Sequence, residues 1–119
     1  MTRYFVGLDL GQAADYTAIS AIEVRPTPYP VQHEDRDPET RRLRTFETVV
    51  ESIPLTHHVR HLERLPIGTP YPEQVARVKE IMARLPPGTD LIVDNTGVGR
   101  AVTDMLFLEG LAPVCVTIT

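Results

Sequence analysis

The sequence predicts one α/β domain in which three strands are followed by two helix–strand units, in the order βββαβαβ. The first half of the chain holds short runs of aromatic and β-branched residues, which are typical of strands. The second half holds two segments with apolar residues at helical spacing, and each leads into a short apolar run. A length of 119 residues and a hydrophobic content of 42% suit a single core. We therefore expect a mixed five-stranded sheet with helices packed on it, because crossover units add parallel strands to an antiparallel meander.

The antiparallel part of the sheet is expected from the first half of the chain. Residues 3–10, RYFVGLDL, predict a first buried strand that Gly11 ends. Residues 16–24 alternate and predict a second strand, joined to the first by GQAAD, which has the length of a hairpin loop. Residues 25–42 hold four prolines and mixed charge without periodicity, so we expect an exposed excursion. Residues 43–55 alternate enough for a third antiparallel strand.

The second half is expected to add two helices and two parallel strands. Residues 72–85 predict a helix, with a proline and a glutamate suited to its first turn. Residues 91–94, LIVD, predict a short apolar strand. Residues 95–110 predict a second helix with a glycine past its end, and residues 112–119 predict the last strand.

A histidine-rich segment, residues 56–65, invites a metal interpretation that its context does not favour. His57 and His61 are four residues apart, which would suit one helix face, and His58 lies between them. No acidic or third ligand is placed with them, and prolines flank the segment on both sides. We therefore interpret the segment as a solvated linker.

The charge balance argues against a simple electrostatic nucleic-acid binder. The formal net charge is −4, so any contact with nucleic acid must depend on a local basic patch or on bound metal. The run of Arg41, Arg42 and Arg44 is one such candidate edge for phosphate, although runs of this kind are more often solvated strand ends.

Cysteine usage and hydropathy point to a cytoplasmic protein. The single cysteine, Cys115, excludes an intramolecular disulfide and a cysteine-based zinc site, and its apolar neighbours predict a buried core thiol. The sequence has no signal peptide and no apolar run long enough to span a bilayer. We therefore expect a cytoplasmic location without membrane partners.

Two aspartates, Asp9 and Asp94, are the first candidates for chemistry. Both belong to apolar strands, and ligands of open α/β sheets gather outside the carboxyl ends of the strands. Two neighbouring carboxylates repel one another unless a cation lies between them, and hard ions such as Mg²⁺ suit that position. The alternative is structural: Asp94 could cap the next helix or hold a turn, a role that Asn95 or Thr96 could also fill.

Four further residues near these strands are candidates for supporting roles. Asp15 could hydrogen-bond the hairpin backbone, as aspartates in turns commonly do, or reach the metal region from its rim. Gly97 and Gly99 precede a helix, whose N-terminus favours anions, although they could simply permit a tight turn. Arg100 is unfavourable for the helix dipole in a first turn, which suggests that it faces an anion such as a phosphate.

The segments YFVGLDLGQAADYTAI and LIVDNTGVGRAVTDML together resemble a known family. They are similar to the C-terminal nuclease domain of phage terminase large subunits, within the ribonuclease H-like superfamily. The resemblance is strongest at residues 4–24 and 90–118 and cannot be assigned within residues 25–72. It implies a ribonuclease H-like fold with the order βββαβαβ and a phage or prophage source.

The resemblance also implies an activity and its residues. In that family the acids at the positions of Asp9 and Asp94 hold two divalent ions, Mg²⁺ or Mn²⁺, which activate a water to cleave DNA during packaging. Asp104 is expected at an exposed position of the following helix. The substrate would be DNA, in the cytoplasm of a bacterial or phage-infected cell.

The chain departs from the family in two respects, and the alternatives follow from them. The family's third acid comes from a helix after the last strand, whereas this sequence ends at Thr119, and no G-x-x-x-x-G-K-[ST] motif is present. The expectation is thus a nuclease domain without that helix, either truncated or inactive, with homo-oligomerisation at an open sheet edge as one source of the missing acid. One alternative is a non-catalytic module that binds nucleic acid or protein. The other is an actin-like nucleotide-binding lobe, because the segment GLDLG resembles the phosphate loop of that fold.

Overall fold

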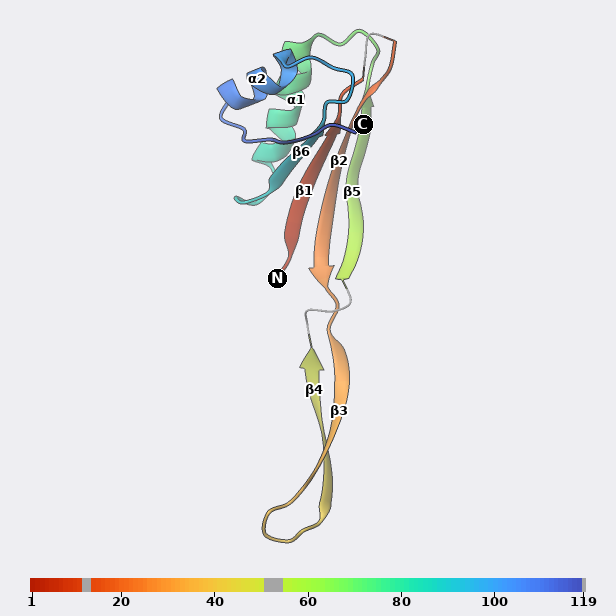
Figure 1. Cartoon of the computed structure of the whole chain (residues 1–119), viewed down its shortest axis with the longest axis vertical. Helices are drawn as coiled ribbons and strands as arrows, with labels where there is room; N and C mark the ends of the chain where they lie inside the picture. The colour runs from red at the N-terminus through yellow and green to blue at the C-terminus, as the bar shows by residue number, and fades with distance from the viewer. Residues whose placement is uncertain (12–13, 51–54, 119) are drawn as a thin grey trace. The chain divides into compact units, whose positions relative to one another are not determined.

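The computed structural model of the chain describes residues 1–11, 14–50 and 55–118. The chain forms two compact units: Arg25–Thr56 with Met1 make one, and Thr2–Val24 with His57–Thr119 make the other. The larger unit holds a five-stranded sheet and both helices, and the smaller unit holds a two-stranded sheet (Figure 1).

The main sheet is mixed, and its strands lie in the order β5-β2-β1-β6-β7. Its strands are β1 (Arg3–Asp9), β2 (Thr17–Pro26), β5 (Leu55–Leu65), β6 (Asp90–Asp94) and β7 (Val114–Val116). Strand β1 pairs antiparallel with β2 and parallel with β6, and β6 pairs parallel with β7. The α/β class and the mixed five-stranded sheet expected from the sequence are confirmed.

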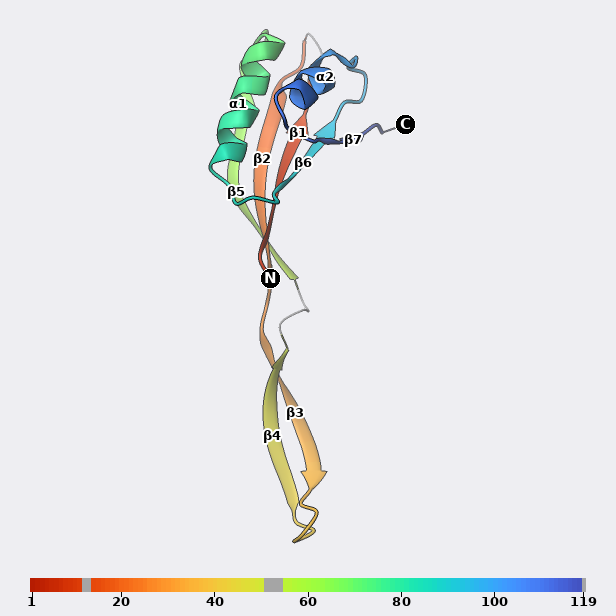
Figure 2. The ribbon, with the colours of Figure 1, turned by 90° about the vertical axis from the view of Figure 1, so that its left-hand side faces the viewer.

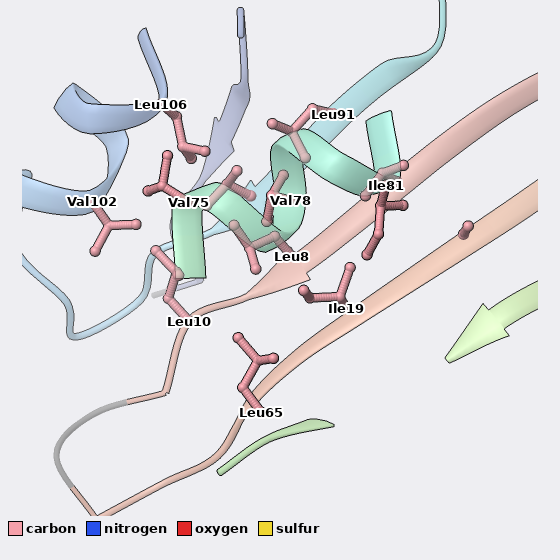
Figure 3. Packing of buried hydrophobic residues seen from close by; sticks show 13 residues of the cluster. Leu8, Leu10, Ile19, Leu65, Val75, Val78, Ile81, Leu91, Val102 and Leu106 are labelled. Atoms are coloured by element: carbon pink, nitrogen blue, oxygen red, sulfur yellow. The ribbon is translucent and has the colours of Figure 1, made fainter. Parts of the chain in front are cut away.

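One face of the sheet and the two helices enclose the hydrophobic core. The helices are α1 (Tyr71–Ala83) and α2 (Ala101–Leu108). In β1, Val6 and Leu8 are buried, and Leu8 is in register with Ile19 of β2 and Val93 of β6. Figure 3 shows the side chains of both helices meeting those of the strands in this cluster. Both helices pack against this face, and Figure 2 gives a second view of them beside the sheet. No described helix covers the opposite face.

The helices differ in how closely they match their expected bounds. Helix α1 agrees with the prediction, with Glu73 in its first turn. Helix α2 was expected from residue 95 onward but begins at Ala101. The physical reason is the turn before it: Gly97 has a φ of 72°, a left-handed conformation that glycine adopts without steric cost and that interrupts a right-handed helix.

The prediction of a solvated linker at residues 56–65 is wrong, because these residues form most of the edge strand β5. Leu65 is buried in the core, while Leu62 is 73% exposed. An edge strand has one neighbour and much contact with water, so its apolar alternation is weak. Strand β5 is therefore the third strand of the main sheet along the chain, a role that the sequence predicted for residues 43–55.

The smaller unit corrects two further predictions. Residues 25–42, expected to form an exposed excursion between two strands of the main sheet, contain β3 (Tyr29–Arg36), which pairs antiparallel with β4 (Leu43–Val50). The expected strand 43–55 therefore pairs within this hairpin, and its residues 51–54 lie outside the described residues. Cross-strand contacts explain the pairing: the rings of His33 and Phe46 stack with centroids 5.0 Å apart.

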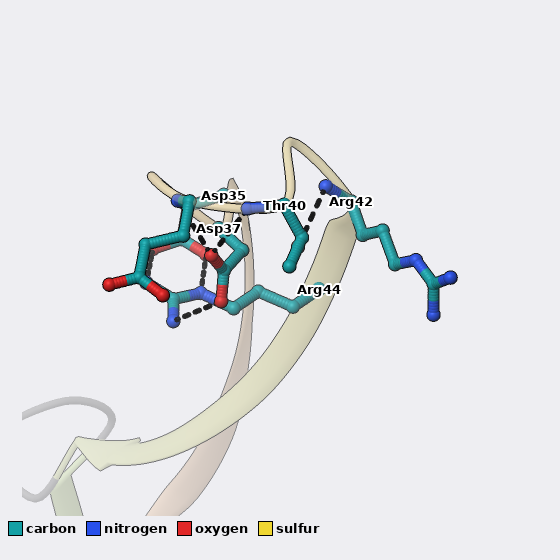
Figure 4. A network of polar contacts seen from close by, with 6 residues as sticks. Asp35, Asp37, Thr40, Arg42 and Arg44 are labelled. Atoms are coloured by element: carbon teal, nitrogen blue, oxygen red, sulfur yellow. Dashed lines mark hydrogen bonds and ion pairs between the residues drawn. The ribbon is translucent and has the colours of Figure 1, made fainter.

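The tip of the hairpin is ordered by polar contacts (Figure 4). Asp37 Oδ1 accepts hydrogen bonds from the backbone N–H groups of Glu39 at 2.8 Å and Thr40 at 3.0 Å. The Arg44 guanidinium donates to both carboxylate oxygens of Asp35. Arg44 is thus already paired within the hairpin, and the expected role of the arginine run in binding phosphate stays a prediction.

The expectation of a buried thiol at Cys115 is wrong, because this residue is exposed on β7. Strand β7 is three residues long and lies at the edge of the sheet, and all of its residues are exposed. Among the described residues, no helix is long and apolar enough to cross a membrane.

Candidate functional site

Asp9 and Asp94 are register partners on the adjacent parallel strands β1 and β6. Each is the last residue of its strand, so the two carboxylates lie at the same, carboxyl edge of the sheet. Neighbouring strands are roughly 4.8 Å apart, and residues in register point to the same face. The structure therefore brings together the two aspartates that the sequence singles out.

The aspartate pair lines a hollow of about 250 Å³ on the face of the sheet opposite the helices. Its other lining residues include Ser20, Leu62 and Ile92. Asp9 is exposed to solvent although its neighbours Leu8 and Leu10 are buried. Successive residues of a strand face opposite sides, so an apolar strand can carry a carboxylate here without burying it.

Gly7 lines the floor of this hollow, where it has no side chain to fill the space. A Cβ atom at Gly7 would lie 2.9 Å from the hydroxyl oxygen of Ser20 on β2. Any larger side chain at Gly7 would therefore displace Ser20 or fill the space beside the aspartates. The absence of a side chain at Gly7 therefore leaves the space next to Asp9 unfilled.

Asp94 also holds the turn that follows β6, which agrees with the structural alternative considered for it. Its Oδ1 accepts hydrogen bonds from the Thr96 backbone N–H at 3.0 Å and from the Thr96 hydroxyl at 2.6 Å. These two hydrogen bonds hold the pKa of Asp94 below its ordinary value, and the bond from the hydroxyl has the larger effect. No described residue donates a hydrogen bond to its second oxygen, Oδ2, so that oxygen is left for a ligand.

Thr96 is a site residue that the sequence offered only as an alternative cap. Its hydroxyl donates to Asp94 and accepts a hydrogen bond from the Ile118 backbone N–H at 2.8 Å. Asn95 makes a parallel contact, because its Oδ1 accepts from the Thr117 hydroxyl at 2.8 Å. The two contacts join the loop after β6 to the segment after β7.

The expected phosphate-binding residues lie in the loop before α2, apart from the lining of the aspartate hollow. Gly97 and Gly99 belong to this loop, and Arg100 is the N-cap residue of α2, with an exposed side chain that makes no capping hydrogen bond. The Arg100 carbonyl accepts from the Thr103 hydroxyl at 2.9 Å. The role of these residues in phosphate binding stays a prediction.

Asp15 lines a different hollow, of about 120 Å³, together with Thr17 and Gln74. In its wall, the Thr17 hydroxyl accepts a hydrogen bond from the Gly11 N–H at 3.1 Å and donates to Gln74 Oε1 at 3.2 Å. The structure thus does not bring Asp15 to the lining that Asp9 and Asp94 share, and its expected supporting role stays a prediction.

Two residues in contact with one another, Arg64 and Tyr16, were not predicted as site residues. The guanidinium carbon of Arg64 lies 4.1 Å from the centroid of the Tyr16 ring. Arg64 belongs to β5, which the sequence predicted as a linker, so no signal in the sequence placed it on the same sheet as Asp9.

The donors present suit a hard divalent ion but form a small set. Within residues 1–11, 14–50 and 55–118, no three histidine, cysteine, aspartate or glutamate side chains gather closely enough to hold a metal. His61 instead lies with its Nε2 2.7 Å from Glu63 Oε1. Mg²⁺ is commonly bound by one or two carboxylates, with waters and substrate phosphates as its other ligands. Asp9 and Asp94 fit that chemistry.

The fold and the site define an α/β protein with a mixed five-stranded sheet and two carboxylates at its open face. Comparison of the chain with protein-family models, curated proteins and solved structures gives no match.

Proposed function

We propose that this chain is a divalent-metal-dependent nuclease domain of the ribonuclease H-like type, similar to the nuclease domain of phage terminases, and that its substrate is DNA. The observation that carries the proposal is the register pairing of Asp9 with Asp94 at the carboxyl edge of β1 and β6. The order of elements agrees with it. When the β3–β4 hairpin is treated as an insertion, the main sheet and its helices follow one another as βββαβαβ.

In this proposal, Asp9 and Asp94 hold Mg²⁺ or Mn²⁺. Two carboxylates this close repel one another, and a cation between them removes that cost. Thr96 positions Asp94 by donating two hydrogen bonds to Oδ1, so that Oδ2 faces the ligand. When bound, such ions lower the pKa of a water and stabilise charge on a phosphodiester. The face around the pair is free of described helices, which leaves room for a nucleic-acid strand.

A second candidate is a module of the same fold that binds nucleic acid or protein without cleaving it. The observation that favours it is the small donor set: in the part of the chain that the structure describes, no third metal-binding side chain joins the two aspartates. A two-carboxylate site binds an ion more weakly than a site with more acids. Such a module could therefore keep the fold and lose the chemistry.

A calorimetric titration with Mn²⁺ tests the metal site. We expect saturable binding by the wild type and loss of binding in both Asp9→Asn and Asp94→Asn. Asp104→Asn is the matched control, because Asp104 is exposed on α2 away from the pair. Absence of Mn²⁺ binding by the wild type would contradict the nuclease proposal.

Cleavage of supercoiled plasmid DNA in Mn²⁺ separates the two candidates. Nicking by the wild type and by Asp104→Asn, but by neither of the other variants, is the result expected of a nuclease. Metal binding without cleavage of DNA or RNA would assign the chain to the binding module.

A further inference from the structure

We propose that Arg64, stacked on the ring of Tyr16, binds a backbone phosphate of a nucleic-acid strand that lies across the open face of the sheet beside Asp9 and Asp94. The identity of the ligand rests on the proposed function. The placement of Arg64 rests on the structure of β5 and β2, which is independent of any metal.

The open face carries Arg64 and the aspartate pair on the same side. Leu62 lines the hollow that contains Asp9 and Asp94. Arg64 follows Leu62 by two residues on β5, so both point to the same face of the sheet. The edge strand β5 thereby adds a cation to a surface whose other strands supply two carboxylates.

The position of Tyr16 fixes where this cation lies along the sheet. Ala18 of β2 is the register partner of Asp9. Tyr16 precedes Ala18 by two residues, which is roughly 7 Å along an extended chain. The Tyr16–Arg64 pair therefore lies beyond the carboxyl edge of β1, on the β5 side of the aspartates, and the strand order β5-β2-β1-β6 brings it nearer to Asp9 than to Asp94.

The stacking leaves the polar edge of Arg64 available. At 4.1 Å from the ring centroid, the guanidinium is within cation–π distance, which holds it flat on the ring. No described residue accepts a hydrogen bond or forms an ion pair with it. An arginine fixed in this way presents a planar set of N–H donors, and that geometry matches two oxygens of a phosphate.

Three other arginines in the larger unit have acidic partners. Arg60, also on β5, contacts Glu23 at 3.0 Å, and Arg77 on α1 contacts Glu63 at 2.8 Å. Arg3 contacts Asp90 at 3.0 Å. Arg64 differs because its partner is an aromatic ring, which fixes the side chain without neutralising its charge.

The overall charge makes such a residue necessary for the proposed ligand. With a net charge of −4, the chain as a whole repels a polyanion, and two carboxylates at the site add to that repulsion. A fixed cation beside the pair reduces it locally. The exposed side chains of Leu62 and Ile92 on the same surface can contact sugars or bases.

Fluorescence anisotropy with a labelled DNA oligonucleotide tests the proposal. Binding is measured in Ca²⁺, which carboxylates also coordinate, over a series of salt concentrations. For Arg64→Ala we expect affinity to fall about fivefold or more, and the slope of log K against log salt to become shallower by about one, because one phosphate contact is lost. Arg64→Lys keeps the charge without the planar donors, so its affinity for DNA should lie between those of the wild type and Arg64→Ala.

Control variants separate the contact from a general loss of structure. Tyr16→Phe keeps the ring and should bind as the wild type does, whereas Tyr16→Leu should lose part of the affinity. Arg84→Ala, at the C-terminal end of α1, should leave both affinity and slope unchanged. Wild-type affinity and slope in Arg64→Ala, or no oligonucleotide binding by the wild type, would overturn the proposal.

A parallel Mn²⁺ titration of Arg64→Ala distinguishes this inference from the proposed function. If Mn²⁺ still binds and DNA affinity is unchanged, the phosphate contact is refuted and the metal site stands. If DNA binding depends on Arg64 and the wild type binds no Mn²⁺, the phosphate contact stands and the nuclease proposal fails. Displacement of the oligonucleotide by inorganic phosphate or ATP at similar concentrations would reassign the site to a small phosphate ligand.

Discussion

Glu63 on β5 accepts a hydrogen bond from the Arg77 guanidinium on α1, with 2.8 Å between Arg77 Nε and Glu63 Oε1. The contact joins the edge strand to the helix that packs beside it. Burial raises the pKa of Glu63, but hydrogen bonds and charge from His61 and Arg77 together lower that pKa below its ordinary value. A carboxyl whose pKa is lower in the folded state stabilises the fold at pH values above its unfolded pKa, about 4.3.

Glu63→Gln should therefore reduce stability at neutral pH, because the ion pair and one acceptor are lost. The stabilisation that Glu63 provides disappears as pH falls through its lowered folded-state pKa, so wild type and variant should converge in acid. Urea unfolding at pH 7 and pH 3 measures this. Glu80→Gln is the control: Glu80 also contacts Arg77 at 2.8 Å but is 63% exposed, so its loss should matter less. An equal loss in the two variants would contradict the argument.

Thr96 should be needed both for the turn and for the metal site. Thr96→Val keeps the shape of the side chain but removes the donor to Asp94 and the acceptor for the Ile118 N–H. We expect a destabilisation of about 1 kcal/mol and weaker Mn²⁺ binding, because the Asp94 carboxylate is no longer oriented. Thr96→Ser keeps the hydroxyl and should match the wild type in both measurements. Unchanged Mn²⁺ affinity in Thr96→Val would show that Asp94 does not depend on this contact.

The aspartate pair could be predicted from the sequence because its position follows from local rules. The apolar runs around Asp9 and before Asp94 place both carboxylates on strands, and Asp94 at a strand end, without knowledge of distant contacts. That Asp9 also ends its strand comes from the structure. The edge strand β5 could not be predicted in the same way. Its histidines interrupt the apolar pattern, and only pairing with β2 identifies it as a strand.

The hairpin and the Arg64 contact depend on partners that the linear pattern does not reveal. Strand β3 carries one proline, Pro30, and several charges that are typical of a loop, and its stability comes from cross-strand pairs such as His33 with Phe46. Arg64 meets Tyr16 only after β5 has taken its place beside β2. Contacts of this kind join residues far apart in sequence, whereas periodicity describes near neighbours.

The short helix α2 should depend on its buried face for stability. A helix of eight residues is marginal by itself, and Leu106 is fully buried in the core. Leu106→Ala should lower the free energy of unfolding by about 2–5 kcal/mol through lost burial and a residual cavity. Leu108→Ala is the matched control, because Leu108 is 86% exposed, and it should change stability by less than about 0.5 kcal/mol. Urea denaturation measures the free energy of unfolding of the two variants. A similar decrease in both would contradict the packing described for α2.

Removing one carboxylate of the pair should have opposite effects with and without metal. In EDTA at low salt, Asp9→Asn should unfold at a higher temperature than the wild type, since repulsion between Asp9 and Asp94 is relieved. Added Mn²⁺ should raise the melting temperature of the wild type, because a ligand at a hundred times its Kd stabilises by about 2.7 kcal/mol. The same addition should leave Asp9→Asn unchanged, while Asp104→Asn should respond as the wild type does. A melting temperature of Asp9→Asn that rises with Mn²⁺ as much as that of the wild type would place the metal elsewhere on the chain.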